Sequence, residues 1–400
     1  MLERLWSILS LQAGYNTTVV LAGTTLLGVG AAVIGSFVLL RKRALVSDAI
    51  SHATLPGIAL GFLVAYAAGL DGGRNLPILL LGAAATGALG VFAVQWIRDH
   101  TRLPEDTAIG TVLSVFFGAG MVLLSHIQTL PGGSRAGLGS FLLGQTAALS
   151  QSEAWLIGLS ASVVILLSLL FFKEFAVLCF DPGFARAQGW PVRGLDLLMM
   201  GLLLATVSIG LKTVGLVLIV ALLIIPPAAA RFWTHRLAGM VLVAGIFGGA
   251  AGYLGAALSA LFPRLPAGGI IVLAAGGLFA VSLLVAPRRG IVAGGFRQLA
   301  FRLAAIERHA LLTLAAGGRP AGLGGVLLRL RGQVDGSGRV TARGTVAMRV
   351  AARNQALWLR YLEDFPQDAL AREDWGRAPI DRALPRDLVA ELERRAGATG

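Results

Sequence analysis

The sequence predicts an all-α polytopic membrane protein with eight or nine transmembrane helices, followed by a small α+β domain. Of its 400 residues, 56% are hydrophobic and only 14% are charged, whereas a soluble domain carries about a quarter of its residues charged. Apolar segments of about 20 residues, the length of a transmembrane helix, recur before Pro287. From Pro287 onward the chain has 19 basic and 11 acidic residues, against 15 and 10 in the much longer part before it.

Nine apolar segments are candidate spans: 17–40, 45–70, 76–97, 106–126, 153–172, 194–211, 213–230, 237–262 and 267–286. The sixth and seventh are short and nearly continuous, and Pro226 and Pro227 lie near the end of the seventh. Nine spans, or eight spans and one broken or re-entrant segment, both fit this pattern. We expect residues 1–16 to form an extracytoplasmic or interfacial segment, 17–287 a transmembrane domain and 288–400 a cytoplasmic domain.

The orientation follows from the basic residues in the loops. One set of alternate loops holds twelve Lys and Arg, among them the cluster Arg41 to Arg43 and the pair Arg288 and Arg289. The opposite set, with the N-terminus, holds five. Because cytoplasmic loops carry the excess of positive charge, the first set and the C-terminal domain are predicted to be cytoplasmic.

Two ionisable residues, Asp48 and His52, stand inside the second apolar segment, in LVSDAISHATLPGIALGF. Ionisable residues in spans are costly and usually functional. Their spacing of four places both side chains on one face of a helix, one turn apart. A carboxylate oxygen and an imidazole nitrogen suit a divalent ion such as zinc, manganese or iron. The pair is therefore a candidate metal site.

Further groups surround this candidate site. Ser47, Ser51 and Thr54 add hydroxyls, and Pro56 with Gly57 would free backbone carbonyl groups. Two strong ligands are too few for tight binding, so a second subunit or another helix would complete the shell. The same spacing also fits an Asp and a His that only satisfy each other, and the spacing alone leaves both interpretations open.

The loop after the fifth segment contains a local helix signal. Asp181 followed by Pro182 is a favourable helix start, with Asp181 as N-cap and Pro182 in the first turn. Gly189 and then Pro191 would end the helix. The sequence predicts a helix of about two turns, which by itself indicates only an ordinary amphipathic surface helix.

Four segments together resemble the metal ABC transporter permeases of the zinc, manganese and iron class. They are LVSDAISHATLPGIALGF, EDTAIGTVLSVFFGAGMVLLS, KEFAVLCFDPGFARAQGWPVRGLDLL and KTVGLVLIVALLIIPPAAARFWT, within residues 15 to 286. The resemblance implies that Asp48 and His52 line the translocation path and contact the metal. It also implies that one loop forms the coupling helix that docks on the ATPase subunit. The residues of this loop are Phe180, Asp181, Pro182, Phe184, Ala185, Ala187 and Gly189.

The resemblance also implies the partners of the chain. The chain contains no GxxxxGK[ST] phosphate loop, so we expect a transport subunit that is not itself an enzyme. A separate ABC ATPase, an extracytoplasmic metal-binding protein and a second or related permease would complete the complex in a bacterial cytoplasmic membrane. No resident cofactor is expected, only transported manganese, zinc or iron. The alternatives are a permease for a metal chelate of the siderophore or cobalamin type and an ion-coupled secondary transporter.

The tail is predicted to contain helices over 299–315, 323–331 and 345–364, with a β-hairpin in GQVDGSGRVTARG. The order resembles the winged-helix domain of iron-dependent repressors, mainly through VTARGTVAMRVAARNQALWLRYLEDF. Gln355 stands where that family has a histidine. Because this winged-helix-like domain is tethered to a bilayer and lacks a clear recognition helix, we expect it to contact the ATPase, the second permease or membrane lipid, and not nucleic acid.

Overall fold

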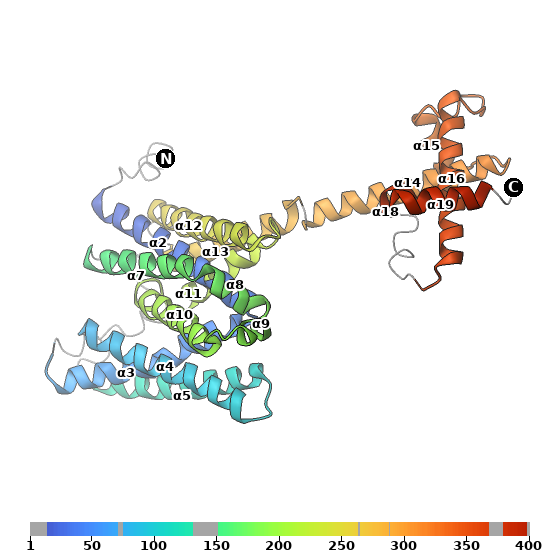
Figure 1. The fold of residues 1–400 in the computed structure, drawn as a ribbon. Coiled ribbons are helices and arrows are strands. Elements are labelled where there is room, and N and C mark those ends of the chain that lie inside the picture. Colours follow the sequence, from blue (N-terminus) through green and yellow to red (C-terminus); the bar gives the residue numbers. More distant parts are fainter. Residues whose placement is uncertain are drawn as a thin grey trace. The chain divides into compact units, whose positions relative to one another are not determined.

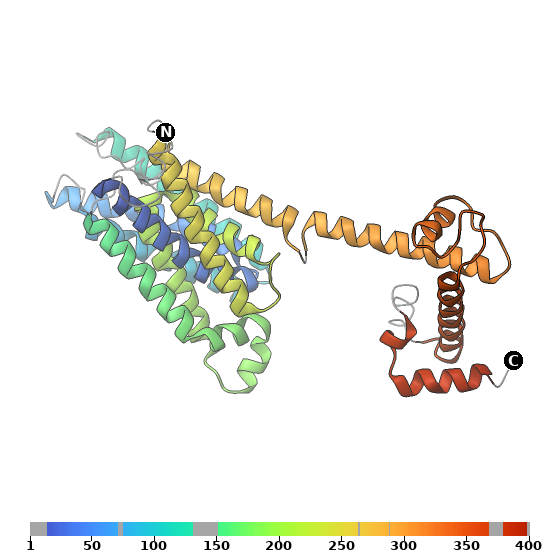
Figure 2. The same cartoon turned by 90° about the horizontal axis from the view of Figure 1, so that it is seen from above.

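The computed structural model describes residues 14–70, 75–130, 151–262, 265–287, 289–367 and 379–397. The chain divides into two compact units, Met1–Ile291 and Val292–Gly400. Figure 1 labels the helices of both units, and Figure 2 shows the same helices from a perpendicular direction.

The first unit is a bundle of helices. They are α2 (Tyr15–Leu40), α3 (Ala44–Ala67), α4 (Leu76–His100), α5 (Glu105–Thr129), α7 (Gln151–Leu170), α8 (Phe172–Phe180), α9 (Pro182–Ala187), α10 (Val192–Val214), α11 (Leu216–Ala230), α12 (Leu237–Leu261) and α13 (Ala267–Val285). In the described part of the chain, eight of these are long and apolar enough to cross a membrane, and α11 is a shorter apolar helix. This outcome agrees with the expectation of eight spans and one interrupted segment.

The interruption lies at Gly215, between α10 and α11. Its φ of +86° falls in the left-handed region, which glycine adopts without the steric cost that a side chain brings. One almost continuous apolar run therefore becomes a full-length span and a helix of 15 residues. Pro226 and Pro227 are buried inside α11 and do not end it.

The helices of the first unit pack in two groups joined by α10. In one group, α3 packs against both α4 and α5. In the other, α2 packs against α7, α11 and α12, and α13 packs against α11 and α12. α10 contacts α2 and α7 as well as α3 and α4, so it connects the two groups (Figure 1).

The second unit is helical in its described residues. It contains α14 (Ile291–Ala315), α15 (Gly322–Leu330), α16 (Ala342–Asp364), α18 (Ile380–Ala383) and α19 (Arg386–Gly397). One small core gathers Leu328 of α15 with Ala310 and Leu311 of α14. A second core surrounds the buried Trp358 of α16 with residues from α18 and α19.

The expectation of an α+β winged-helix-like domain is wrong for the described residues, which contain no strand. Where a hairpin was predicted, there is only an isolated antiparallel bridge between Val334 and Val340. The Asp335 carboxylate accepts hydrogen bonds from the backbone N–H groups of Ser337 and Arg339, at 3.0 and 2.7 Å, and closes a tight turn. Of the eleven residues between α15 and α16, residues 331–333 and 336–338 form turns and bends, so only Val334 and Val340 pair across the loop.

Candidate functional site

Asp48 and His52 lie next to each other near the beginning of α3. His52 Nε2 is 3.5 Å from Asp48 Oδ1, and the two side chains are 18% and 36% exposed. The Phe117 ring of α5 packs edge-on against the imidazole, with ring centres 4.9 Å apart. The structure thus brings the predicted pair together with room for an ion to reach the carboxylate, while its role as a metal ligand stays a prediction.

His52 has a second nitrogen that is not engaged. Its Nδ1 is buried and has no hydrogen-bond partner among the described residues. With the proton on Nε2, facing Asp48, Nδ1 carries a lone pair, which is the form of imidazole that binds metals. Pro56 has no N–H. The carbonyl oxygen of His52, one turn earlier in the helix, therefore lacks its usual helical hydrogen bond.

The hydroxyls around the pair are occupied by the helix backbone. Ser47 donates to the Ala44 carbonyl at 2.5 Å, Ser51 to Ser47 at 2.8 Å, and Thr54 to Ser51 at 2.7 Å. No group of three or more His, Cys, Asp or Glu side chains in the described ranges could hold a metal ion. A single chain therefore offers two strong ligands at this place, too few for a closed metal site.

Close backbone contacts hold α3 between its neighbours. A Cβ at Gly57 would lie 2.0 Å from the Gly82 carbonyl oxygen of α4. On the other side, a Cβ at Gly120 of α5 would lie 2.8 Å from the Leu55 Cβ. Because these glycines let the backbones approach, the helix that carries Asp48 and His52 is fixed on two sides.

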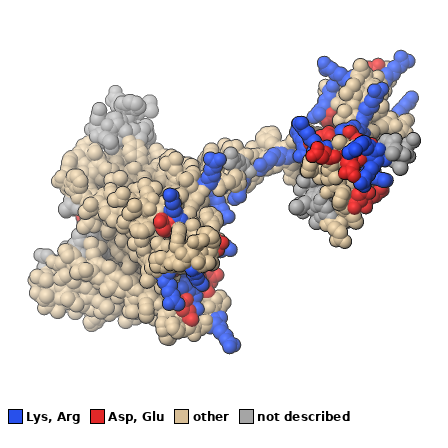
Figure 3. Space-filling model, in the orientation of Figure 1, with Lys and Arg blue, Asp and Glu red and all other residues tan. Residues whose placement is uncertain are grey.

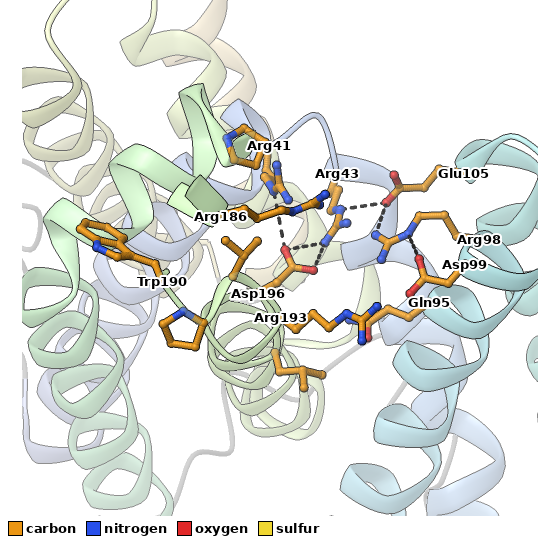
Figure 4. A pocket seen from close by; sticks show the side chains of 14 residues that line it. Arg41, Arg43, Gln95, Arg98, Asp99, Glu105, Arg186, Trp190, Arg193 and Asp196 are labelled. Atoms are coloured by element: carbon orange, nitrogen blue, oxygen red, sulfur yellow. Dashed lines mark hydrogen bonds and ion pairs between the residues drawn. The ribbon is translucent and has the colours of Figure 1, made fainter. Parts of the chain in front are cut away.

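A buried charge cluster lies where α3 begins (Figure 4). Arg43 Nη1 donates to both carboxylate oxygens of Asp196, at 2.7 and 2.6 Å, and Arg43 Nε is 2.8 Å from Glu105 Oε1. Arg43 and Asp196 are each only 6% exposed. A buried arginine is tolerated only where paired carboxylates and hydrogen bonds offset its desolvation. The cluster therefore ties together the beginning of α3, α5 and α10.

A cleft of about 940 Å³ opens beside this cluster. Besides the cluster it is lined by Arg98 of α4, Arg186 of α9, Trp190 just before α10, and Arg193 in the first turn of α10. Figure 3 shows that the charged side chains of the first unit gather near α9, while the rest of the visible face carries almost none. Sequence reasoning missed this cluster because its members come from separate segments. The available signal was a carboxylate, Asp196, at the start of an apolar span.

The loop with the predicted coupling residues contains the short helix α9. Asp181 Oδ1 accepts the Phe184 N–H at 2.8 Å, and Pro182 occupies the first turn. Gly189, with φ of +76°, follows the end of the helix. Ala185 is buried, while Phe180 and Phe184 are exposed. The helix starts where the sequence predicted, and its docking on an ATPase stays a prediction.

The chain is similar to known transport proteins. The model of the ABC 3 transport family matches residues 15–286, which include every described helix from α2 to α13. The manganese transport system membrane protein MntC of Bacillus subtilis is 46% identical over 314 residues, or 78% of this chain and 70% of that protein. The zinc transport system membrane protein TroC of Treponema pallidum is 40% identical over 286 residues, which are 72% of this chain and 94% of that protein.

A solved structure has a similar fold. PsaBC from Streptococcus pneumoniae, in complex with Fab, superposes with a TM-score of 0.62 at 30% identity. The similarity covers 72% of this chain and 98% of that chain.

Proposed function

Since this chain belongs to the ABC 3 transport family, we propose that it is the membrane permease subunit of an ATP-driven importer for a divalent transition metal. The observation that carries the proposal is the family match over the whole helical bundle. Relatives that are 46% and 40% identical are named for the transport of manganese and zinc, so these two metals are the first substrates to test, with iron third.

In this proposal Asp48 and His52 contact the metal as it passes along α3. The 3.5 Å separation of His52 Nε2 from Asp48 Oδ1 and the partly exposed carboxylate of Asp48 support the assignment. Two ligands from one chain bind an ion weakly enough to release it, which conduction requires. A second copy of the permease or a related one supplies the remaining ligands.

The energy comes from a partner. The chain has no phosphate-binding loop of the GxxxxGK[ST] type, so a separate ABC ATPase hydrolyses ATP. We place α9 against that subunit, where the exposed Phe180 and Phe184 offer apolar contact. The basic loops then face the cytoplasm of a bacterial cell, and an extracytoplasmic metal-binding protein delivers the ion on the other side.

Metal uptake tests the proposal. Cells that carry the permease with its ATPase are starved separately of manganese, zinc and iron, and uptake is compared between the wild type, Asp48→Ala and His52→Ala. Both variants should lose uptake of one metal, because each removes one of two strong ligands. His126→Ala is the matched control, since His126 is an exposed histidine in the last turn of α5.

The amount of permease in the membrane is measured for every variant. Normal uptake by Asp48→Ala and His52→Ala at normal abundance would mean that the pair is structural. Uptake by the wild type in cells without the ATPase would contradict the importer and point to ion-coupled transport. Uptake only in the presence of a siderophore or cobalamin would point to a chelate permease.

A further inference from the structure

The first half of α14 has an apolar face that no described residue of its own unit covers. Val292, Phe296 and Leu299 follow one another at helical spacing and share this face. Their exposed fractions are 49%, 69% and 53%. Large apolar side chains in a row at such exposure indicate an interaction surface.

The same face continues into the second half of the helix, where the protein does cover it. Ile306 and Ala310 extend the row, and Ala310 is buried in the core that α14 forms with α15. The helices approach closely there, because a Cβ at Gly324 would lie 2.9 Å from the Ala310 Cβ. The second unit thus covers one half of a continuous apolar row and leaves the other half open.

The open half begins close to the end of the last span. α13 ends at Val285 and α14 begins at Ile291. The Gly290 N–H donates to the Ala286 carbonyl at 2.8 Å, so the connection forms a turn. Even fully extended, it would reach at most about 22 Å. The first turns of α14 are therefore within reach of the lipid head groups, a layer about 5–7 Å deep at each membrane surface.

The charge of this segment indicates what covers the open apolar face. Residues 286–306 contain four arginines and no acidic residue. Two of the arginines, Arg297 and Arg302, lie in the open half of α14 and outside its apolar row. A paired helix from a second copy would place these arginines near their own like charges, whereas an anionic membrane surface attracts basic residues beside a transmembrane helix.

We propose that the first half of α14 is an amphipathic membrane anchor, which inserts Val292, Phe296 and Leu299 among lipid head groups and binds anionic phospholipid through its arginines. The inference rests on the membrane placement of residues 15–286 in the proposed function, and it does not depend on the transported metal. The anchor would fix the beginning of the second unit to the cytoplasmic leaflet.

Fluorescence of the full-length chain in lipid nanodiscs tests the anchor. A bimane label is attached to Leu299→Cys on the apolar row, or to Ala304→Cys outside it as the matched control. The single native cysteine, Cys179, is replaced by serine in both variants, so that the introduced cysteine is the only thiol. In nanodiscs of phosphatidylcholine and phosphatidylglycerol, spin-labelled lipid should quench the label at position 299 and leave the label at 304 bright.

The arginines are tested in the same system. Replacing phosphatidylglycerol by phosphatidylcholine, or introducing Arg297→Gln with Arg302→Gln, should reduce the quenching at position 299. Equal quenching at 299 and 304, or none at 299, would overturn the anchor. A disulfide between two chains through Leu299→Cys without lipid quenching would assign the face to a second copy. None of these readings requires transport, so loss of the anchor and loss of the importer proposal are distinguishable.

Discussion

At the scale of single residues, two polar groups near the beginning of α3 have opposite environments. Arg43 is buried with its guanidinium bonded to Asp196 and Glu105, so its charge is compensated. His52 has one nitrogen near Asp48 and another that is buried without a hydrogen-bond partner in the described chain. The first arrangement stabilises the fold, whereas the second leaves a buried nitrogen without a hydrogen bond. An unsatisfied buried polar atom is uncommon and is often found at functional sites.

Replacing Asp196 should destabilise the first unit strongly. Asp196→Ala leaves the buried Arg43 with Glu105 as its remaining partner, and loss of a buried partner costs about 3–5 kcal/mol of unfolding free energy. Thermal unfolding of the purified protein in detergent measures the effect. Asp99→Ala is the control, because its pair with Arg98 is more exposed and contributes only about 0–1 kcal/mol. Equal melting temperatures for the two variants would contradict a structural role for the buried cluster.

At the scale of helices, glycine decides which elements meet in the first unit. α2 and α12 cross at Gly28 and Gly248, where a Cβ on either residue would lie 2.2 Å from the carbonyl oxygen of the other. Apolar side chains gain little by leaving lipid for another helix, so close packing of small residues determines such pairings. This crossing holds α2 against α12. Both helices belong to the group that α10 connects to α3.

Gly248→Ala should force α2 and α12 apart. Overpacking of this kind costs about 1–3 kcal/mol, and here the obstacle is backbone that cannot rotate away. Gly276→Ala in α13 is the matched control, since no atom lies within 4 Å of a Cβ at that position. Melting temperatures and the fraction of monodisperse protein after mild heating compare the two variants. A larger loss for Gly276→Ala would contradict the packing argument.

At the scale of the whole molecule, the surfaces of the two units suit different surroundings: lipid for the first unit and water for the second. Residues 1–286 contain only 10 acidic and 15 basic residues, so most of the surface of the first unit suits lipid. The second unit has small cores around Leu328 and Trp358, and exposed ion pairs such as Arg353 with Asp381 and Glu393. Neither of its cores includes a residue from before Ala310.

A chain that ends after Gly290 should therefore still fold in the membrane. Its melting temperature should stay within a few degrees of the full-length value, because the deleted residues contribute to none of the cores of the first unit. The melting temperature is measured in detergent, as the temperature at which heated protein stops eluting as a single species in size-exclusion chromatography. Aggregation of the shortened chain at temperatures where the full chain is monodisperse would show that the second unit is required for the fold.

Features that depend on neighbouring residues could be predicted from the sequence alone. The spans could be located because crossing hydrocarbon requires about 20 apolar residues in a row. The start of α9 could be located because the Asp181 side chain caps the helix by accepting the N–H of Phe184, only three residues further along the chain. The contact of Asp48 with His52 followed in the same way from one helical turn.

Features that join distant residues became visible only in the folded chain. Arg43 and Asp196 are 153 residues apart in the sequence, and no local pattern indicates such a partner. The resemblance of the tail to a winged helix failed because a turn around Asp335 and the helices beside it leave no room for strands. The apolar row of α14 could be recognised as half open only after α15 was seen to cover the other half. Burial is a property of the assembled chain, and periodicity shows which faces are apolar but not what covers them.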